Sequence, residues 1–232
     1  MNRVPWISRV AAVASLGDEN RRRLFDVVTA APDAVGRDDA AAALGMARST
    51  ASFHLDRLVR DGLLAVEFRK LGGKEGPGSG RPAKLYRAAV EEVSASVPER
   101  NYDLAAELLV SAVEDSAADG GSARDALLRA ARVRGGAAAD AAGADDFPSV
   151  LVAEGYQPAD DGEGGLVLLN CPFHRVAQGH AGVVCAMNGA FLGGAAAACG
   201  VDPARVEALD IEQLRADGAA SPVQCCARIL PA

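Results

Sequence analysis

The sequence predicts a mainly α chain with small β elements (α+β), and three observations support this class. Half of the 232 residues are apolar but only 4% are aromatic, and alanine is the commonest residue, which is typical of helix-rich proteins. Apolar residues recur at helical spacing in several segments, with short strand-like segments between them. Residues 1–90 hold 15 Lys and Arg against 10 Asp and Glu, whereas residues 91–232 hold 9 against 21. This asymmetry predicts a basic binding module in front of an acidic domain with another function.

Three helices are expected at the start of the chain. From Asp18 to Ala30, apolar residues recur at helical spacing behind acidic residues that suit a helix N-terminus. A short helix over Arg37 to Leu44 is broken by Gly45, and a third helix over Arg48 to Asp61 ends at Gly62. Two helices joined by such a tight turn are typical of a helix-turn-helix, whose second helix enters the major groove of DNA.

The third helix is expected to have an apolar face and a polar face. If its leucines face the core, a step of about 100° per residue places the polar residues on the opposite side, where a major groove would lie. His54 lies at the edge of the core face, where packing or phosphate contact is expected. The residues of this helix expected to contact DNA are Arg48, Ser49, Thr50, Phe53, His54 and Arg57.

A basic hairpin is expected next. Leu63 to Arg69 and Lys84 to Arg87 are predicted strands on either side of the glycine-rich segment from Leu71 to Gly80. Cationic side chains on such a wing can follow phosphates or probe the minor groove through their charge. The hairpin residues expected to contact DNA are Lys70, Lys74, Arg81 and Lys84.

The run STASFHLDRLVRDGLL from Ser49, with GRPAKLYR from Gly80, closely resembles the winged helix-turn-helix of ArsR/MarR-type bacterial regulators. The resemblance covers about residues 15–90. It implies that Ser49 to Arg57 corresponds to the recognition helix, that Lys70 to Arg81 corresponds to the wing tip, and that the partner is double-stranded DNA. The alternative is a winged helix that docks a protein, with arginines that only solvate an exposed face.

Residues 91–146 are expected to form a helical linker and dimerisation region. Tyr102 to Ala118 is a predicted helix with one apolar face. In regulators of this sort such a helix commonly forms the dimer interface. A two-fold symmetric protein reads a palindromic operator, so a homodimer is expected. Packing of this helix against the wing is the alternative. Ser122 to Arg134 is a further predicted helix, and Gly135 to Asp146 is expected to be a flexible link or a weak helix.

Residues 147–232 are expected to form a small α/β domain that contains all five cysteines. Phe147 to Glu154 is a predicted helix, and strands are expected over Tyr156 to Ala159, over Leu166 to Asn170 and near the C-terminus. Pro172 at a first helical position would place Cys171 at a helix N-cap, where backbone amides and the helix dipole stabilise a thiolate.

The cysteines are expected to be reduced, and their odd number favours a metal or redox site over disulfides. Cys199 would lie about 21 Å from Cys185 on one continuous helix, and is therefore expected to be structural. Neighbouring residues on a strand point to opposite faces, which favours Cys225 over Cys226 for the site. The expected metal ligands are Cys171, Cys185 and Cys225, with His174, His180 or Cys226 as candidate additional ligands.

Three such cysteines suit an iron-sulfur cluster, [4Fe-4S] or [2Fe-2S], or alternatively zinc. The architecture resembles the SufR-like repressors, which are winged-helix regulators with an iron-sulfur cluster in a C-terminal domain. This resemblance implies a repressor whose operator affinity is controlled by the cluster. Cys226 and Cys199 depart from the family's pattern. The same segment is also consistent with a small-molecule effector pocket lined by Ala and Gly, or with cysteines that serve only as small buried hydrophobes.

Catalysis and membrane insertion are not expected. The glycine-rich segment Gly76 to Gly80 precedes a strand and not a helix, and a thiol hydrolase built on Cys171 and His174 would add catalysis to a DNA-reading protein without need. The apolar stretch from Val10 to Leu16 is too short for a secretory signal. Ala181 to Val201 is mostly Ala and Gly, which favours a buried helix over a membrane span. The protein is therefore expected to be cytoplasmic.

Overall fold

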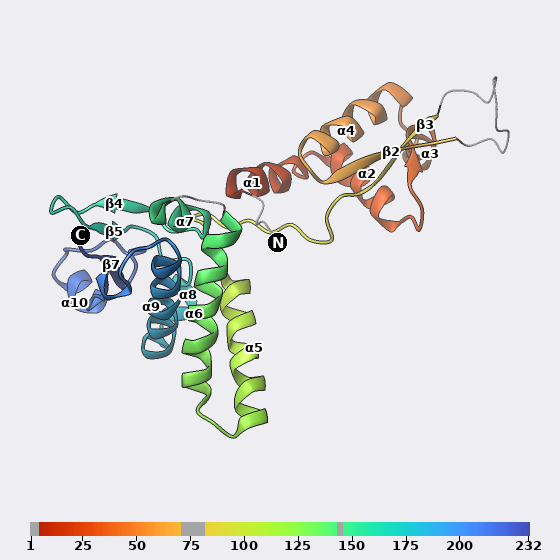
Figure 1. Cartoon of the computed structure of the whole chain (residues 1–232). Helices are drawn as coiled ribbons and strands as arrows, with labels where there is room; N and C mark the ends of the chain where they lie inside the picture. The colour runs from red at the N-terminus through yellow and green to blue at the C-terminus, as the bar shows by residue number, and fades with distance from the viewer. Residues whose placement is uncertain (1–4, 71–81, 143–145) are drawn as a thin grey trace. The chain divides into compact units, whose positions relative to one another are not determined.

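The computed structural model describes residues 5–70, 82–142 and 146–232, which form two compact units, residues 5–95 and residues 96–232 (Figure 1). The expected α+β class is confirmed, because helices dominate and two small antiparallel sheets accompany them. The structure groups the helices that follow residue 101 with the cysteine-containing segment in one unit.

The first unit is built on four helices around a leucine-rich core. Asp18 caps the second helix, since its side chain accepts a hydrogen bond from the Arg21 amide at 2.9 Å. Gly45, with φ of 61°, ends the third helix and begins the turn into the fourth. The buried core includes Leu24, Leu55 and Leu58. The helices are α1 (Trp6–Ser15), α2 (Glu19–Ala30), α3 (Arg37–Leu44) and α4 (Arg48–Arg60).

A three-stranded antiparallel sheet completes this unit, with strand order β1-β3-β2. The expected hairpin is present as β2 (Leu64–Arg69) and β3 (Ala83–Ala88), with Val66 opposite Tyr86. β1 (Val35–Gly36) pairs with the other edge of β3 and was not expected, because two residues are too short to show a period. The segment from Leu71 to Arg81, which includes the expected wing tip, lies outside the described residues.

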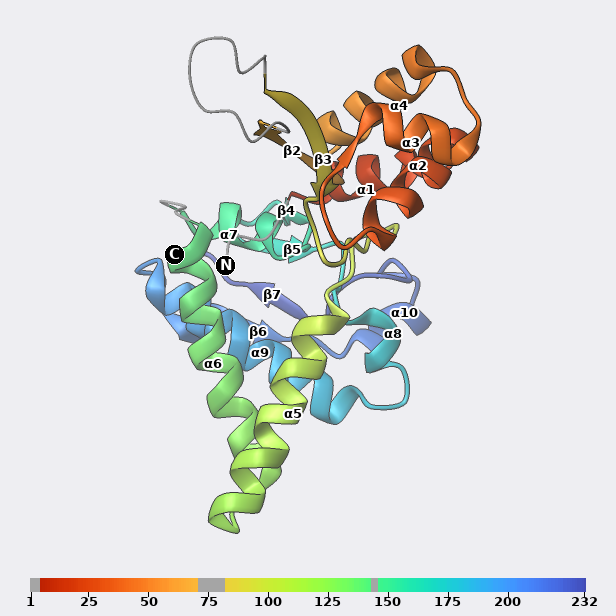
Figure 2. The same cartoon turned by 90° about the vertical axis from the view of Figure 1, so that its right-hand side faces the viewer.

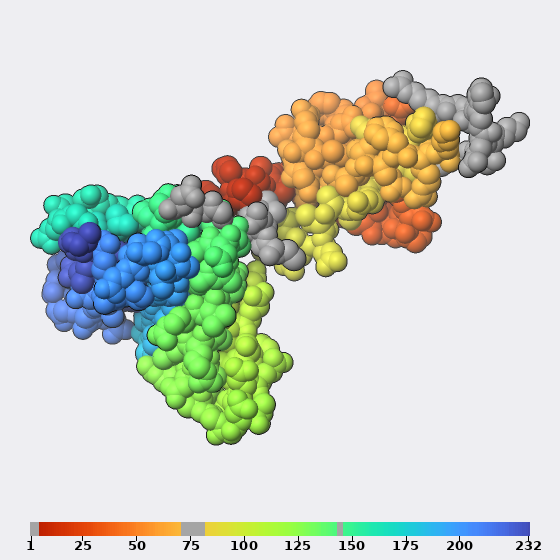
Figure 3. Space-filling view, viewed as in Figure 1, coloured from red at the N-terminus to blue at the C-terminus, as the bar shows by residue number. Residues whose placement is uncertain are grey.

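The second unit is layered in the order α5, α6, α9 and sheet (Figures 1 and 2). The loop end of the α5–α6 hairpin extends beyond α9, as the space-filling view also shows (Figure 3). The long helices are α5 (Tyr102–Asp119), α6 (Ala123–Ala142) and α9 (Ala181–Ala198). Among the described residues, α9 alone is long and apolar enough to cross a membrane, and half of it is buried inside the protein.

Of the two alternatives expected over Gly135 to Asp146, a flexible link or a weak helix, the structure has a helix in the first part, because α6 continues to Ala142. Gly135 and Gly194 let the backbones of α6 and α9 approach closely. A Cβ on Gly135 would lie 2.0 Å from the carbonyl oxygen of Phe191, and a Cβ on Gly194 would lie 2.0 Å from that of Arg132. The glycines that weaken the helix locally therefore permit the packing that stabilises it.

The second sheet is antiparallel and has the order β4-β5-β7-β6. Its strands are β4 (Pro158–Asp160), β5 (Leu166–Leu168), β6 (Val206–Ala208) and β7 (Ala227–Ile229). The short helices around it are α7 (Phe147–Ala153), α8 (His174–Ala177), η1 (Pro203–Arg205) and α10 (Ile211–Ala216). Phe173, Phe191 and Leu168 are among the largest side chains buried in the core that joins this sheet to α9 and α6.

Candidate nucleic-acid interface and cysteine pocket

The face of α4 opposite the core is exposed and basic. Ala51, Leu55 and Leu58 are fully buried, as the helical spacing predicts. Phe53 is 61% exposed although it is aromatic. Thr50 is half-buried at the edge of this face. The exposed residues of α4 are Arg48, Ser49, Phe53, Arg57 and Arg60.

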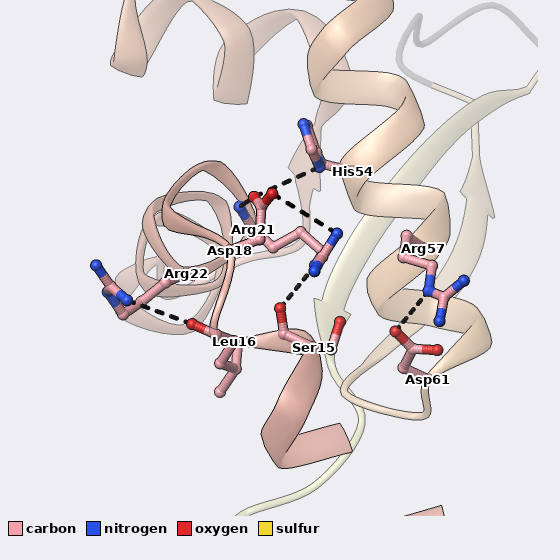
Figure 4. Close-up of polar contacts among 8 residues, drawn as sticks. All are labelled: Ser15, Leu16, Asp18, Arg21, Arg22, His54, Arg57 and Asp61. Atoms are coloured by element: carbon pink, nitrogen blue, oxygen red, sulfur yellow. Dashed lines mark hydrogen bonds and ion pairs between the residues drawn. The ribbon is translucent and has the colours of Figure 1, made fainter. Parts of the chain in front are cut away.

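Polar contacts hold α4 against the start of α2 (Figure 4). His54 is only 9% exposed, and its Nδ1 lies 3.8 Å from Oδ1 of Asp18. The Nε of Arg21 donates to the Ser15 carbonyl oxygen at 2.6 Å, which ties α2 to the end of α1. His54 thus packs inside the unit, whereas the other predicted DNA-contacting residues of α4 lie at or near the surface.

Arg57 is exposed but oriented. Its Nε donates to Oδ2 of Asp61 at 2.9 Å, four residues along the chain (Figure 4). Because this contact uses only one nitrogen of the guanidinium, the two terminal nitrogens keep donors for other acceptors. The side chain is therefore held on the exposed face of α4 in a geometry that suits phosphate or base acceptors.

Asp56 fastens the wing to α4. Its Oδ1 accepts from Lys84 Nζ at 2.5 Å and from the Tyr86 hydroxyl at 2.8 Å, and both donors lie on β3. Burial would raise the pKa of Asp56, but the hydrogen bonds from Lys84 and Tyr86 outweigh it and lower that pKa. Lys84, predicted from sequence as a DNA contact, is therefore engaged within the unit.

We expect Asp56→Asn to destabilise residues 5–95 by about 1 kcal/mol at pH 7, because the carboxylate is 45% exposed and its charge is partly screened. A lowered pKa means that this stabilisation is present above the ordinary value of 3.8 and is lost as pH falls below it. Thermal unfolding of the wild type and the variant at pH 7 and below pH 3.8 measures the difference in stability. Asp38→Asn is the matched control, because the Asp38–Arg48 pair is mostly exposed and should contribute almost nothing.

The described part of the wing also carries exposed cations. Arg69, Lys70 and Arg87 are exposed, and Arg69 contacts Glu67 at 2.6 Å. Phe68 on β2 is 70% exposed. Lys74 and Arg81, the other wing residues predicted to contact DNA, lie outside the described residues.

The structure brings four of the five cysteines together. The Cys171 thiol interacts with Cys225, Cys225 with Cys226, and Cys226 with Cys185 by side-chain hydrogen bonds. All four are free thiols. Cys199 lies apart at the C-cap of α9, and its charged neighbours are Asp146 and Asp140. His180, the N-cap residue of α9, is exposed.

The thiol network divides into proton donors and acceptors. Hydrogen bonds from the Cys185 and Cys225 thiols lower the pKa of Cys226 to about 3. The Cys225 thiol likewise lowers the pKa of Cys171, although its single S–H donates to only one of Cys171 and Cys226 at a time. The pKa values of Cys185 and Cys225 are raised by the same contacts, with burial as a further cause. A lowered pKa favours the thiolate, which is the protonation state in which sulfur binds metals.

A cavity of about 90 Å³ opens beside three of these thiols. Its lining includes Cys171, Cys185 and Cys226, together with His174 and Arg215. Within the described residues, the Nε of Arg215 is buried without a hydrogen-bond partner. Burial lowers the pKa of His174, and the positive charges of Arg215 and Arg100 add to this effect. A cationic donor with spare hydrogen-bonding capacity favours a negatively charged occupant.

Two sequence expectations about these cysteines are wrong in detail. Cys171 is not an N-cap, because α8 begins only at His174 and has Phe173 as its N-cap; the Phe173 amide nevertheless donates to the Cys171 sulfur. The cysteine pair at 225 and 226 precedes β7, and a bend at Cys226 interrupts the strand alternation. Both thiols can therefore join the network.

Asn188 and Tyr156 were missed by sequence reasoning. The buried Asn188 amide donates to Cys225 Sγ at 3.1 Å, and its Oδ1 accepts from the Tyr156 hydroxyl at 2.5 Å. Asn188 is the one strongly polar residue among the apolar and small residues of α9, and this is the sequence signal that could have identified it. Outer hydrogen bonds of this kind orient a ligating group.

A single metal ion is not matched by the side-chain geometry. In residues 5–70, 82–142 and 146–232, no three His, Cys, Asp or Glu side chains are grouped so that they could hold one metal ion. A tetrahedral zinc site needs sulfurs about 2.3 Å from one centre. An iron-sulfur cluster contains several irons and so distributes its thiolates over more than one metal atom.

Comparison with known proteins matches the front of the chain. The family described as "Helix-turn-helix domain" matches residues 16–67, which span α2, α3, α4 and part of β2. No curated protein matched the chain, and no solved structure matched it. The chain therefore contains a helix-turn-helix domain, the kind of domain found in DNA-binding transcription regulators.

Proposed function

We propose that this protein is a cytoplasmic transcriptional repressor that binds a palindromic operator as a homodimer, and whose affinity for DNA is controlled by an iron-sulfur cluster in residues 96–232. The helix-turn-helix domain supports DNA binding. The observation that carries the regulatory half is the network of four thiols from three separate segments, three of which line one small cavity.

The exposed face of α4 and the wing supply the DNA contacts. Arg48, Arg57 and Arg60 on α4 and Arg69, Lys70 and Arg87 on the hairpin add positive charge on the two elements that touch DNA in winged helices. Phe53 presents an exposed ring on the same face of α4, where an apolar side chain can contact the methyl group of thymine.

We expect Arg57→Glu to lower affinity for DNA at least about tenfold and to reduce the dependence of binding on salt concentration. The reversal removes a cation from the α4 face and repels phosphates. Binding to a fragment selected by the wild-type protein from random DNA, titrated at several salt concentrations, measures both effects. Arg175→Glu makes the same charge change at an exposed position of α8, outside α4, the wing and the two helices of the proposed dimer surface, and should leave the affinity of cluster-free protein unchanged. Equal losses in the two variants would contradict the interface.

Cys171, Cys185, Cys225 and Cys226 would hold the cluster. Iron-sulfur clusters take cysteine thiolates as ligands and supply electron-transfer chemistry when bound. Asn188 would orient the Cys225 sulfur, and the positive charge of Arg215 would balance negative charge in the cavity. His174 lines the cavity as a candidate ligand if one cysteine is not used.

The size of the cavity argues against the small-effector alternative. Pockets for organic ligands typically measure about 300–1,000 Å³, whereas this cavity measures about 90 Å³. Its lining combines three cysteines, His174 and Arg215 with apolar residues such as Ala181 and Ile211, and among the described residues it includes no glycine, unlike the Ala- and Gly-lined pocket expected for a small effector. A compact inorganic group fits these dimensions better.

Anaerobic purification followed by iron, sulfide and zinc analysis tests the cofactor. Visible absorption with matched iron and sulfide is expected, and DNA affinity should differ between loaded and cluster-free protein. A colourless protein with one zinc per chain would contradict the cluster and support the zinc alternative.

The α5–α6 hairpin is the proposed dimer surface. Of the apolar residues on α5, Leu104 and Leu108 are buried within the unit, whereas Leu109, Val110 and Val113 are exposed. Val133 on α6 is 74% exposed. α5 carries five acidic and no basic residues, and α6 carries four arginines. A second copy packed antiparallel would bring an acidic helix against a basic one, and such a self-complementary surface suits a two-fold dimer.

A further inference from the structure

Three segments of the second unit meet around Asn170. They are the chain that leaves the DNA-binding unit (residues 99–101, the connector), the turn at the end of α7 (Glu154 and Gly155) and the loop that carries Cys171. Asn170 is fully buried. Its Nδ2 donates to the carbonyl oxygens of Glu99 at 2.9 Å and Gly155 at 2.7 Å.

The acceptor oxygen of Asn170 is also used, so the side chain is fully engaged. Arg100 Nη1 donates to Asn170 Oδ1 and also to the Cys171 carbonyl oxygen at 3.2 Å. The Asn101 amide donates to the carbonyl oxygen of Pro172 at 3.0 Å. The connector is therefore hydrogen-bonded on both sides of Cys171, at the residue before it and at the residue after it.

The turn at the end of α7 also contacts the connector, and the meeting point of the three segments around Asn170 is the junction. The Asn101 side chain donates to Glu154 Oε2 at 3.2 Å. Gly155 has a φ of 91°, and a Cβ at this position would lie 3.1 Å from the Glu99 side chain. A residue with positive φ and no side chain lets the turn sit directly on the connector.

We infer that Asn170 is a positioning residue that couples the site around Cys171 to the connector of the DNA-binding unit. The inference rests on the proposed function for what occupies that site. Movement of the Cys171 loop on cluster binding or loss changes the hydrogen bonds that Asn170 makes to residues 99–101. The connector follows residues 5–95 within a few residues in the chain, so a change in its order acts on the peptide link to the DNA-binding unit. Coupling of this kind requires a physical element that both sites contact, and this junction supplies one.

Hydrogen exchange in the full chain tests the inference. In cluster-free Asn170→Ala, the Asn101 amide should exchange at least about tenfold faster than in the wild type, because buried hydrogen bonds of the junction are lost. In the wild type, cluster loading should change exchange at residues 99–101, and in Asn170→Ala this response should disappear while iron content is retained. The ratio of DNA affinities between loaded and cluster-free protein should fall toward one in the variant.

Two controls separate coupling from general damage. Leu169→Ala changes a 40% exposed side chain in the same loop and should keep both the wild-type exchange and the affinity ratio. Amides of α9 should exchange equally in all three proteins. Unchanged Asn101 exchange in Asn170→Ala, or an unchanged response to loading, would overturn the inference. A wild-type protein without iron would contradict the proposed function alone, and Asn101 exchange in the variant would then decide the role of Asn170.

Discussion

Gly135→Ala is expected to destabilise residues 96–232 by about 3 kcal/mol or more, the upper range for overpacking. The added methyl group would lie 2.0 Å from the carbonyl oxygen of Phe191 and 3.0 Å from the amide nitrogen of Ala195. Both atoms belong to the backbone of α9, so no side-chain rotation relieves the clash. The two helices must separate, which opens the core that supports the cysteine pocket. Gly194→Ala should act in the same way against the backbone of Arg132.

Gly136→Ala is the matched control for this clash. Its Cβ would have its nearest neighbour at 3.8 Å, an ordinary contact, and alanine is favoured over glycine in a helix by about 1 kcal/mol. Calorimetry of the full chain measures the effect, because residues 5–95 provide an internal reference transition. If Gly135→Ala and Gly136→Ala unfold at equal temperatures, the close approach of α6 and α9 is contradicted.

Serine in place of Cys171, Cys185, Cys225 or Cys226 is expected to remove at least about nine-tenths of the bound iron and sulfide. A thiolate is the ligand that these clusters bind, and a serine hydroxyl stays protonated in this environment. Anaerobic iron and sulfide analysis with visible absorption gives the measurement for each variant. DNA affinity of each variant should equal that of the cluster-free wild type.

Cys199→Ser is the control for these substitutions, because Cys199 is outside the thiol network and partly exposed. It should retain wild-type iron, sulfide and absorption. Iron loss from this variant, or full retention in all four network variants, would show that the cluster is held elsewhere. Retention in the Cys225 variant alone would leave Cys171, Cys185 and Cys226, the three thiols that line the cavity, with His174 beside them.

The front of the chain was largely predictable from its sequence. Asp18, Gly45 and Gly62 mark helix ends through their local chemistry, and the leucines of α4 recur at the period that buries one face. These signals act within a few residues, so they can be recognised without knowledge of the fold. β1 was missed because its two residues are strand only through pairing with β3.

The cysteine pocket was predictable only in part. Sequence spacing correctly separates Cys185 from Cys199, because a helix has a fixed rise per residue. It wrongly assigned Cys225 and Cys226 to a regular strand, because the bend at Cys226 has no sequence signal. Asn188 and Asn170 were not identified as structural partners, since their hydrogen-bond partners lie 15 to 71 residues away in the chain.

The sequence by itself determined the helix-turn-helix with its basic wing, the helical character of the second unit and the separation of Cys199 from Cys185. Each of these depends on periodicity, capping or charge, which are local properties of the chain. Only the tertiary structure decided that four thiols share one network, that α6 runs unbroken through Gly135, and that Asn170 joins the connector to the Cys171 loop. Those features depend on contacts between distant segments, where packing and burial override local preference.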